Sequence, residues 1–398
     1  MSGRKSFIAS IGILSGIVLC SIDGARASSA EGKQHFWIAC RKDGERGRGT
    51  QASPFDGSTQ AKFDTVLRRF WSERSERVVF HLGPGVYETV GNGGYIAGLR
   101  ELGEGWRCWS AWEIRGSGQD QTVLKLTKQY EYQGNWGNVA IATHDSSVKG
   151  VVVQDLTVDC NHSAIGNEKS SETGVNLQGT GHTIRRVTVR NVAGKGYEGF
   201  PIGIGANAVN SWYNLIEDCT ITDWRGGTGG SITISNNVNN LIPPFTYTSG
   251  IVRRNRVVGT QIGYGGWGMK GVIFEDNLAE GCSYGSNIDS VRNPQVTFRN
   301  NRFLECRSYG MVFANCENIL IENNTVTLTA SGPAIYLLND CADFRVEGNR
   351  FAGTDARVRV SAVQTRDEKS IRGTFRFSGN QMPGEASISL ADFLRNHR

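Results

Sequence analysis

A short residue pattern that recurs at a nearly constant interval constrains the fold of this 398-residue chain more than any other feature. An apolar residue, two polar residues, an asparagine, a variable residue and usually another apolar residue follow one another five times between Gly250 and Phe351. The five asparagines are separated by 22, 24, 23 and 25 residues, and they are Asn255, Asn277, Asn301, Asn324 and Asn349. A fixed period of this length is typical of solenoid proteins, in which each repeat packs only on its neighbours.

Each repeat also carries a second short segment ahead of the one that contains asparagine, as Gly310–Phe313 precedes Ile321–Val326. Two or three short strands per repeat make one superhelical turn, and the strands of successive turns are expected to pair in parallel. Asparagine tolerates the left-handed conformation of a sharp turn, and stacked asparagine side chains bond to one another along an axis. We therefore predict that the asparagine row is a structural ladder and not a catalytic one.

Looser copies of the pattern lie on both sides of the regular ones. The three upstream copies lack the asparagine; they are 31 and 32 residues apart, and the third precedes Asn255 by 36 residues. A last copy ends at Asn380. The regular repeats are thus expected over about 150–382, within a single domain over 28–398. The residues in excess of one coil are predicted to form loops at 159–173, 190–203 and 236–249.

One amphipathic helix is predicted ahead of the strands, over residues 59–71, with Asp56 or Ser58 as its N-cap. An apolar helix face at this position is suited to cover the open end and the exposed edge of the first coil. The apolar residues that recur at helical spacing are Phe63, Val66, Leu67, Phe70 and Trp71.

The N-terminus has the pattern of a secretory signal peptide over residues 1–27. Arg4 and Lys5 precede an apolar stretch, Phe7 to Ile22, and a small-x-small cleavage site ends at Ala27. The apolar stretch is short for a membrane span, so we expect a secreted or periplasmic protein with no membrane association after cleavage. Without residues 1–27 the net charge falls from +5 to +3, which is too weak to indicate nucleic acid binding.

Eight cysteines remain after Cys20 leaves with the signal peptide. Cys282 and Cys306 each follow a ladder asparagine by five residues, so we expect them to stack on adjacent coils. Export permits disulfides, and neighbouring strands are close enough for them. Buried thiols that fill the core are the favoured interpretation, and no Cys-x-x-Cys pair indicates a zinc site.

The repeats resemble the right-handed parallel β-helix of the pectate-lyase-like superfamily, as do the segments Val78–Tyr87 and Gly116-Ser-Gly118. The resemblance covers about residues 55–390. It implies an all-β fold: a right-handed parallel β-helix, a solenoid of about 22–25-residue coils, with an N-terminal capping helix. It also implies a ligand groove along one parallel sheet. It does not fix the chemistry, because the superfamily includes polysaccharide lyases, polygalacturonases, epimerases, tailspikes and non-catalytic adhesins.

One polar strand stands out in the sheet that the superfamily uses for its groove. If Ile288 points inward, Asn287 and Asp289 point outward, because faces alternate along a strand. The neighbouring segments Gly310–Phe313 and Ala334–Leu338 are apolar. A polar strand among apolar ones is a departure that a functional site would explain, and a plain solvated sheet face is the favoured interpretation.

Lyase chemistry needs a base for the proton beside a uronate carboxylate and a cation that neutralises this carboxylate. Lys270 and Arg292 are 22 residues apart, which is one coil, so they are predicted to share an edge. With Asp289 they are the candidate catalytic residues; surface charge at turns is the alternative. Arg292-Asn-Pro294 resembles the Arg-x-Pro near the pectate lyase arginine, although the second arginine is missing. The candidate substrate-binding residues are Asn287, Tyr264, Trp267 and Tyr309.

A hydrolase would need facing carboxylates, and Asp289 has no obvious acidic partner. A calcium-dependent lyase would need a carboxylate cluster on the groove, whereas Asp159 and Asp223 are scattered, so no metal ligands are assigned and Ca²⁺ stays open as a cofactor. The loops at 159–173 and 190–203 are a second candidate site. They contain Asp159, His162, Glu168, Lys169, Lys195, Tyr197 and Glu198, and simple solvation is the favoured interpretation of His162.

The sequence thus favours a secreted carbohydrate-active protein whose partner is an acidic polysaccharide, cleaved by lyase-type β-elimination. A non-catalytic β-helix for glycan binding or cell-surface adhesion is the alternative from another functional class. The two differ in one measurable product, because elimination leaves an unsaturated sugar that absorbs ultraviolet light. The oligomeric state is not predicted.

Overall fold

The structure is a computed structural model that describes residues 32–71, 77–93, 105–129, 137–166, 170–194, 201–207, 212–235, 248–366 and 371–382. The chain divides into two units, Met1–Lys33 and Gln34–Arg398, and the elements below belong to the second unit. The strands of the described residues form a 21-stranded sheet (sheet A), an 11-stranded sheet (sheet B) and a two-stranded ribbon. Strands of successive coils pair in parallel, whereas β5 pairs with β9 in antiparallel orientation.

The elements have the following bounds. Sheet B contains β5 Asn92–Gly93, β6 Trp106–Cys108, β9 Asn138–Thr143, β11 Glu172–Leu177, β14 Pro201–Asn207, β18 Gly230–Ser235, β21 Ile262–Trp267, β24 Tyr284–Asp289, β27 Tyr309–Ala314, β30 Gly332–Leu338 and β33 Val360–Thr365. Sheet A begins with β1 Gln34–Ala39, β2 Phe55–Asp56, β3 Val78–Leu82, β4 Gly85–Thr89, β7 Glu113–Arg115, β8 Thr122–Leu126, β10 Val152–Asp159 and β12 Thr183–Arg190. It continues with β15 Asn214–Glu217, β16 Thr220–Ile221, β19 Gly250–Arg253, β20 Arg256–Val258, β22 Ile273–Glu275, β23 Leu278–Glu280, β25 Val296–Arg299, β26 Arg302–Cys306, β28 Glu317–Glu322, β29 Thr325–Leu328, β31 Cys341–Glu347, β32 Arg350–Gly353 and β34 Ile371–Ser378. The ribbon pairs β13 Val192–Gly194 with β17 Trp224–Gly227, and the described helices are α1 Gln60–Trp71 and α2 His162–Ile165.

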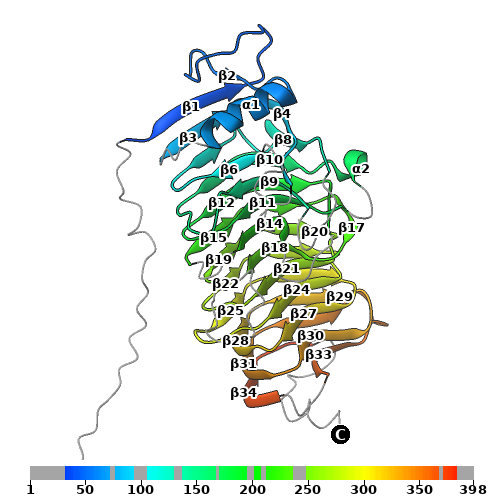
Figure 1. Cartoon of the computed structure of the whole chain (residues 1–398). Coiled ribbons are helices and arrows are strands. Elements are labelled where there is room, and N and C mark those ends of the chain that lie inside the picture. The colour runs from blue at the N-terminus through cyan, green and yellow to red at the C-terminus, as the bar shows by residue number, and fades with distance from the viewer. Residues whose placement is uncertain are drawn as a thin grey trace, which may run out of the picture. The chain divides into compact units, whose positions relative to one another are not determined.

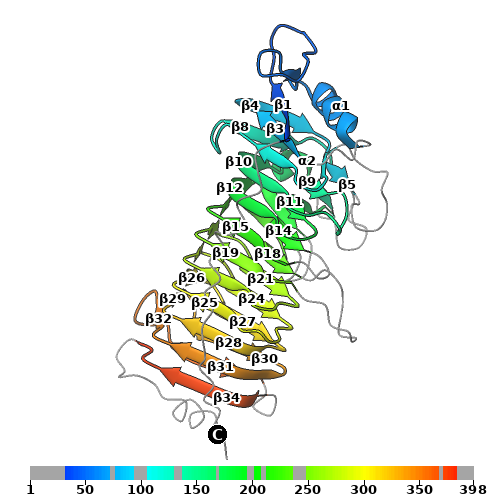
Figure 2. The same cartoon turned by 90° about the vertical axis from the view of Figure 1, so that its left-hand side faces the viewer.

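Each regular coil follows the same path through the two sheets. The chain runs along a strand of sheet B, turns into sheet A for two short strands, and returns to sheet B one coil later, as from β24 through β25 and β26 to β27. Figures 1 and 2 show the strands of successive coils stacked above one another. The residues that point inward from these strands form one continuous apolar core. The solenoid predicted from the repeat is confirmed.

The predicted asparagine ladder is present inside this core. The Nδ2 atom of Asn255 donates to Oδ1 of Asn277 at 3.0 Å, and the same contact joins Asn277 to Asn301 at 3.0 Å. It continues at 2.9 Å from Asn301 to Asn324, and on through Asn349 to Asn380. From Asn277 on, each Oδ1 also accepts the backbone N–H of the preceding ladder asparagine, as Asn301 Oδ1 does from Asn277 at 3.0 Å. The ladder therefore joins six consecutive coils in the described part of the chain.

The left-handed corner beside the ladder is formed by a different residue than the sequence suggested. The residue before each ladder asparagine has positive φ, as Asp276 at 55°, Asn300 at 55° and Asn323 at 55°. The expectation that the ladder asparagines themselves adopt this conformation is wrong. Their side chains point into the core, and a residue whose backbone turns the corner cannot also present its side chain there. At each corner, one residue adopts the left-handed conformation that turns the backbone, and the following asparagine makes the ladder hydrogen bonds.

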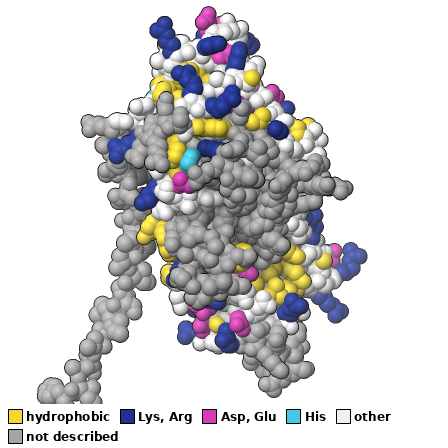
Figure 3. Space-filling view, in the orientation of Figure 1, with side chains coloured by type: hydrophobic (Ala, Val, Ile, Leu, Met, Phe, Trp, Pro, Cys, Tyr) yellow, Lys and Arg dark blue, Asp and Glu magenta, His cyan; other side chains and the backbone are white. Residues whose placement is uncertain are grey.

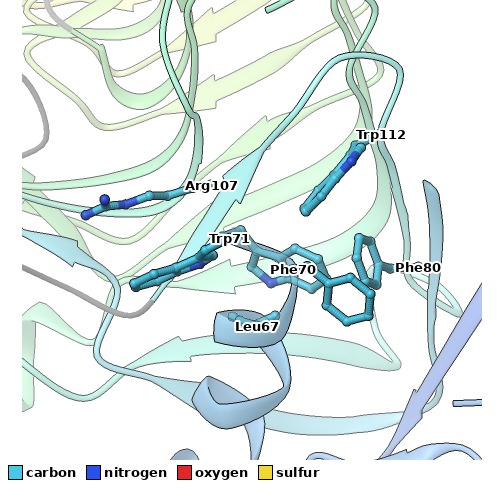
Figure 4. Close-up of a pocket in the computed structure, with 7 residues that line it drawn as sticks. Leu67, Phe70, Trp71, Phe80, Arg107 and Trp112 are labelled. Carbon is cyan, nitrogen blue, oxygen red and sulfur yellow. The ribbon is translucent and has the colours of Figure 1, made fainter. Parts of the chain in front are cut away.

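The predicted helix over residues 59–71 is present as α1, with a different cap. Thr59 Oγ1 accepts the N–H of Lys62 at 3.4 Å, whereas Asp56 bonds to Lys62 Nζ at 2.6 Å and to the N–H of Ser58 at 2.8 Å. The buried face of α1 meets aromatic side chains of the first coil. Figure 4 shows Phe70 of the helix near Phe80 and Trp112, and Trp71 beneath Arg107, whose guanidinium lies 4.9 Å from the Trp71 ring centroid. The helix therefore covers the apolar end of the solenoid, as predicted.

All eight described cysteines are free thiols, which confirms the favoured interpretation. Seven of them are buried, and burial raises the pKa of thiols such as Cys108 and Cys306. The spacing of Leu390, Phe393 and Leu394 predicts a short amphipathic tail, and these residues lie outside the described part of the chain. Neither described helix has the length and apolar character that crossing a membrane requires.

Candidate functional site

The outer face of sheet B carries the polar strand that the sequence singled out. Ile288 of β24 is fully buried in the core, so Asn287 and Asp289 point to the outer face, as predicted. Asn287 is only 7% exposed despite this direction, whereas Asp289 is half-buried. Asp289 has Trp267 of β21 and Ala314 of β27 as its register partners. The strand therefore presents a carboxylate beside an indole on the outside of the sheet.

Two neighbouring groups fix one oxygen of Asp289. Its Oδ1 atom accepts hydrogen bonds from Ser290 Oγ at 2.9 Å and from Asn315 Nδ2 at 3.0 Å. Ser290 and Asn315 occupy left-handed corners, with φ of 57° and 53°. These corners are the turns that follow β24 and β27, so the turn geometry itself aims both donors at the carboxylate. Oδ2 is the oxygen left to face a ligand.

Lys270 and Arg292 lie at the same edge, as their one-coil spacing predicted. Each follows a member of the register pair Trp267–Asp289 by three residues. Arg292 Nη1 donates to the carbonyls of Val291 at 2.9 Å and Asn315 at 2.6 Å. Asn315 therefore connects Arg292 to Asp289, through its carbonyl on one side and its amide on the other.

Arg292 is also close to an acidic side chain on the next coil. Its Nε atom lies 4.0 Å from Glu317 Oε1, and both side chains are 37% exposed. An ion pair this long and this exposed contributes little to stability. The guanidinium is therefore held mainly by backbone carbonyls, and part of it still faces solvent.

Two of the three predicted sugar-stacking rings are unsuitable. Tyr264 is 1% exposed, and its hydroxyl lies 2.8 Å and 2.9 Å from the carbonyl oxygens of Asn255 and Leu278 inside the core. Its register with Ser286, which is fully buried, explains this inward direction. The prediction that Tyr264 contacts substrate is wrong.

Tyr309 points outward, but both faces of its ring are covered. Tyr284 stacks on it with centroids 5.5 Å apart, and Tyr336 stacks on the other side at 4.8 Å. A sugar needs an open ring face, so the predicted stacking role of Tyr309 is wrong as well. Trp267, half-buried beside Asp289, remains the aromatic candidate.

The two strands that follow β24 have an apolar outer face. The outward residues of the next two strands are Val312, Ala314, Tyr336 and Leu338, in register with Asn287 and Asp289. Figure 3 shows hydrophobic side chains gathered over the part of sheet B where Figure 1 places β27 and β30. The apolar character that the sequence shows in these segments therefore extends to both faces of the sheet.

The outer face of sheet A differs from that of sheet B because ion pairs occupy it. Arg253 Nη2 lies 2.8 Å from Glu217, and Arg299 Nε donates to Glu275 at 2.8 Å. Because these charges neutralise one another, less unpaired positive charge is left to bind an acidic ligand. Sheet B therefore remains the better candidate surface.

A second polar cluster lies where α2 leads into β11. His162 Nδ1 is 3.1 Å from Oε1 and 3.0 Å from Oε2 of Glu172, a carboxylate with no exposed surface. The N–H of Ala193 donates to Glu172 Oε2 at 3.2 Å, and Gln129 Nε2 donates to Oε1. Burial raises the pKa of the Glu172 carboxyl, and the contact with His162 opposes this shift.

This cluster corrects the interpretation of His162 and adds Glu172 to the candidate functional residues. His162 is not simply solvated, since its side chain is 17% exposed and paired with Glu172. Sequence reasoning missed Glu172, although an acidic residue two positions before the segment Gly174–Leu177 was a usable signal. Asp159 of the same predicted loop pairs with Arg190, with Nε and Oδ2 3.1 Å apart. The other predicted loop residues, Glu168, Lys169, Lys195, Tyr197 and Glu198, lie outside the described residues.

The described residues bring no group of three or more His, Cys, Asp or Glu side chains into an arrangement that could hold a metal ion.

Comparisons with known proteins agree on the architecture. A family model described as right handed beta helix region matches residues 173–351. No curated protein sequence matches the chain. Similar solved structures include a GH136 lacto-N-biosidase from Eubacterium ramulus, with 11% identity, a TM-score of 0.53 and coverage of 88% of this chain and 68% of that one.

Two further structures are similar to the chain. A rhamnogalacturonan lyase has 12% identity and a TM-score of 0.50, and the match covers 90% of each chain. The tailspike protein of E. coli bacteriophage HK620, solved with a pentasaccharide, has 10% identity and a TM-score of 0.50, over 82% of this chain and 63% of that one. At such identities the likeness establishes the fold. The chain has a right-handed parallel β-helix fold.

Proposed function

We propose that this right-handed parallel β-helix protein binds an acidic polysaccharide on the outer face of sheet B and cleaves it by lyase-type β-elimination. The observation that carries the proposal is the edge after β21 and β24, where Trp267, Asp289, Lys270 and Arg292 occupy matching positions on adjacent coils. A carboxylate, an indole and two cations on neighbouring strands suit an anionic sugar chain. Similar folds that act on or bind saccharides include the lyase and the tailspike described above.

Each residue has a distinct role in the proposed reaction. The guanidinium of Arg292 faces the uronate carboxylate and neutralises it, which acidifies the adjacent C–H. Lys270 Nζ takes this proton, a carbon–carbon double bond forms, and the glycosidic oxygen leaves with a proton from solvent. Trp267 and Asn287 hold the sugar ring, and Asp289 positions it by accepting from a hydroxyl. No step uses a metal ion, and a requirement for Ca²⁺ is tested by adding a chelator.

Glycan binding without catalysis is the second candidate, and a specific observation favours it. Arg292 Nη1 already bonds to two backbone carbonyls, which is the behaviour of an arginine that stiffens a turn. Such a surface can bind a glycan through the indole and the charged side chains, but it has no base that takes the proton in the elimination. An exported β-helix with this property would act as a glycan-binding or adhesion protein.

The deciding experiment is incubation with a panel of uronate polysaccharides while ultraviolet absorbance reports the unsaturated product. We expect product with at least one of them, and a loss of roughly 100-fold or more in rate for Lys270→Ala and for Arg292→Ala. Matched controls on sheet A are Lys125→Ala and Arg256→Ala, which remove the same charges from another face and should leave the rate unchanged.

Three outcomes separate the candidates. If both variants retain full activity, the assigned residues are wrong. Absence of unsaturated product with every polysaccharide, together with binding that Trp267→Ala weakens, supports the non-catalytic candidate. Absence of both product and binding overturns the carbohydrate function altogether. We also propose that residues 1–27 direct export to the periplasm or the medium, which fractionation of expressing cells tests.

A further inference from the structure

The ring of His162 is oriented by its surroundings and not only by Glu172. The backbone of Gly166 packs against it so closely that a Cβ at this position would lie 2.2 Å from Nδ1. The turn that carries the ring is anchored on its other side, because Asn161, in a left-handed conformation with φ of 56°, donates from Nδ2 to the Leu126 carbonyl at 2.9 Å. The N–H of Asn161 donates to Asp159 Oδ1 at 2.9 Å. The imidazole is therefore in contact with Glu172 and Gly166, and the residue before it is anchored to Leu126 and Asp159.

The contact with Glu172 determines which ring nitrogen is left for chemistry. An ionised carboxylate only accepts hydrogen bonds, so Nδ1 carries the proton that faces Glu172. In the neutral ring the lone pair is then on Nε2. A carboxylate that orients an imidazole in this way also stabilises the imidazolium that forms when Nε2 takes a proton.

Two buried acceptors beside Glu172 lack donors. Among the described residues, neither Gln129 Oε1 nor Asn138 Oδ1 has a hydrogen-bond partner. Gln129 contacts Glu172 through its Nε2 atom, and Asn138 is the register partner of Glu172 on β9. Buried acceptors are normally satisfied, so the place is suited to an occupant that donates, such as water or a hydroxyl group.

We propose that His162 and Glu172 form an acid–base pair that serves a hydroxyl-bearing ligand, water or a sugar hydroxyl, at this edge of sheet B. His162 Nε2 accepts the proton of the O–H group, Glu172 balances the charge of the imidazolium, and the proton returns to the ligand oxygen or to water. The pair is separate from Lys270 and Arg292, because β11 and β24 are separated by β14, β18 and β21 in sheet B. The inference goes beyond the proposed elimination and does not depend on it.

The test is the reactivity of His162 toward diethylpyrocarbonate, which modifies unprotonated imidazole nitrogens, with the modified peptides mapped by mass spectrometry. The chain supplies its own references. His35 is exposed, whereas His182 is buried and has Nδ1 and Nε2 bonded to the N–H of Val151 and the carbonyl of Gln178. We expect His162 to react within roughly tenfold of the rate of His35, and His182 to stay unmodified.

The variant Glu172→Gln tests the role of the carboxylate. Without the negative charge Nε2 is a weaker base, so the rate at His162 above neutral pH is expected to fall roughly threefold or more, with the rate at His35 unchanged. Asp159→Asn is the matched control, since it removes a neighbouring acid that does not contact the ring. Circular dichroism before the reaction verifies that each variant is folded.

The proposal is overturned if His162 is as inert as His182, or if Glu172→Gln and Asp159→Asn leave its rate equally unchanged. A further arm adds polygalacturonate. Protection of His162 but not of His35 identifies a sugar hydroxyl as the ligand, and unchanged reactivity identifies water. Because the reactivity comparison needs no polysaccharide, its result is independent of whether the chain proves to be a lyase.

Discussion

His182 shows how a single buried residue makes the stability of this protein sensitive to acid. It is 1% exposed and bonds through both ring nitrogens. Burial disfavours the imidazolium and lowers the pKa of His182 from 6.5 to about 4. Between these two values the unfolded chain binds a proton that the folded chain does not. The contribution of His182 to the free energy of unfolding therefore falls as the pH drops from about 6.5 to about 4.

We predict that this single group removes about 3 kcal/mol of stability between pH 7 and pH 4. The measurement is urea unfolding of the wild type and of His182→Gln at several pH values in that range. Between pH 7 and pH 4, the free energy of unfolding of His182→Gln should fall by about 3 kcal/mol less than that of the wild type. The comparison is needed because burial raises the pKa of Glu172, so this carboxyl acts in the opposite direction. Parallel pH curves for the two proteins would contradict the prediction.

Residue-level predictions from sequence succeeded where alternation decides the direction of a side chain. Asn287 and Asp289 point outward because Ile288 is apolar and belongs to the core. The same reasoning was not sufficient for Tyr264 or Tyr309. The direction of the Tyr264 side chain follows from its register with Ser286, and the two faces of the Tyr309 ring are covered by stacking partners on two other coils. Glu172 was missed because the partner that makes it notable, His162, is in a turn whose path the sequence does not specify.

At the scale of elements, the corner between the two strands of sheet A is the unit that repeats most faithfully. It combines a left-handed residue such as Asn300 with an inward ladder residue such as Asn301. Asn301 donates to the Phe274 carbonyl at 2.9 Å and accepts from Asn277. Removing it would leave several buried polar groups without partners, and each such group is costly.

We predict that Asn301→Ala lowers the free energy of unfolding by roughly 3 kcal/mol or more. Asn300→Gly should be nearly neutral, because glycine adopts the left-handed conformation without strain. Gln364→Ala, at an exposed position of β33, is the surface control and should change stability by less than about 0.5 kcal/mol. Chemical denaturation of the three variants measures these differences. A cost for Asn301→Ala no larger than that for the surface control would show that the ladder is not stabilising.

The period of the asparagines was sufficient to predict the existence and pairing of these strands, because register in a solenoid is set by one residue per coil. The register of the coils upstream of Asn255 was harder to predict from the sequence. Leu156 and Val187 occupy the ladder position without a side-chain amide, and Cys219 joins the ladder only through its N–H, which donates to Asn255 Oδ1 at 2.9 Å. The intervals of 31, 32 and 36 residues that lead to Asn255 are longer than one regular coil. What sequence could not supply was the path of the intervening turns, which depends on contacts such as that of His162 with Glu172.

At the scale of the whole solenoid, stability depends on how its first coil is closed. Phe70 of α1 lies with its ring centroid 4.8 Å from those of Phe36 on β1 and Phe80 on β3. It also packs edge-on against Trp112 at 6.4 Å. In a repeat protein each coil depends mainly on its neighbours, so a defect at the end need not propagate along the stack.

We predict that Phe70→Ala, at a cost of roughly 3–5 kcal/mol, loosens the first coil without unfolding the last. Hydrogen exchange should accelerate at β1, β3 and β7 and stay unchanged at β28 and β31. Phe351→Ala removes a buried ring in a distant coil and is the matched variant. In this variant, exchange should accelerate at β28 and β31 and stay unchanged at β1, β3 and β7. Uniform acceleration in either variant would show that the solenoid unfolds as one cooperative unit.

The asparagine ladder has an electrical consequence as well as a mechanical one. In every rung Nδ2 points toward the following coil and Oδ1 toward the preceding one, so the side-chain amide dipoles are aligned head to tail from Asn255 to Asn380. Hydrogen bonds in such a chain polarise one another, most strongly in its middle. The solenoid thus contains, inside its apolar core, a polarised line parallel to its axis, which distinguishes one end of an otherwise repetitive structure from the other.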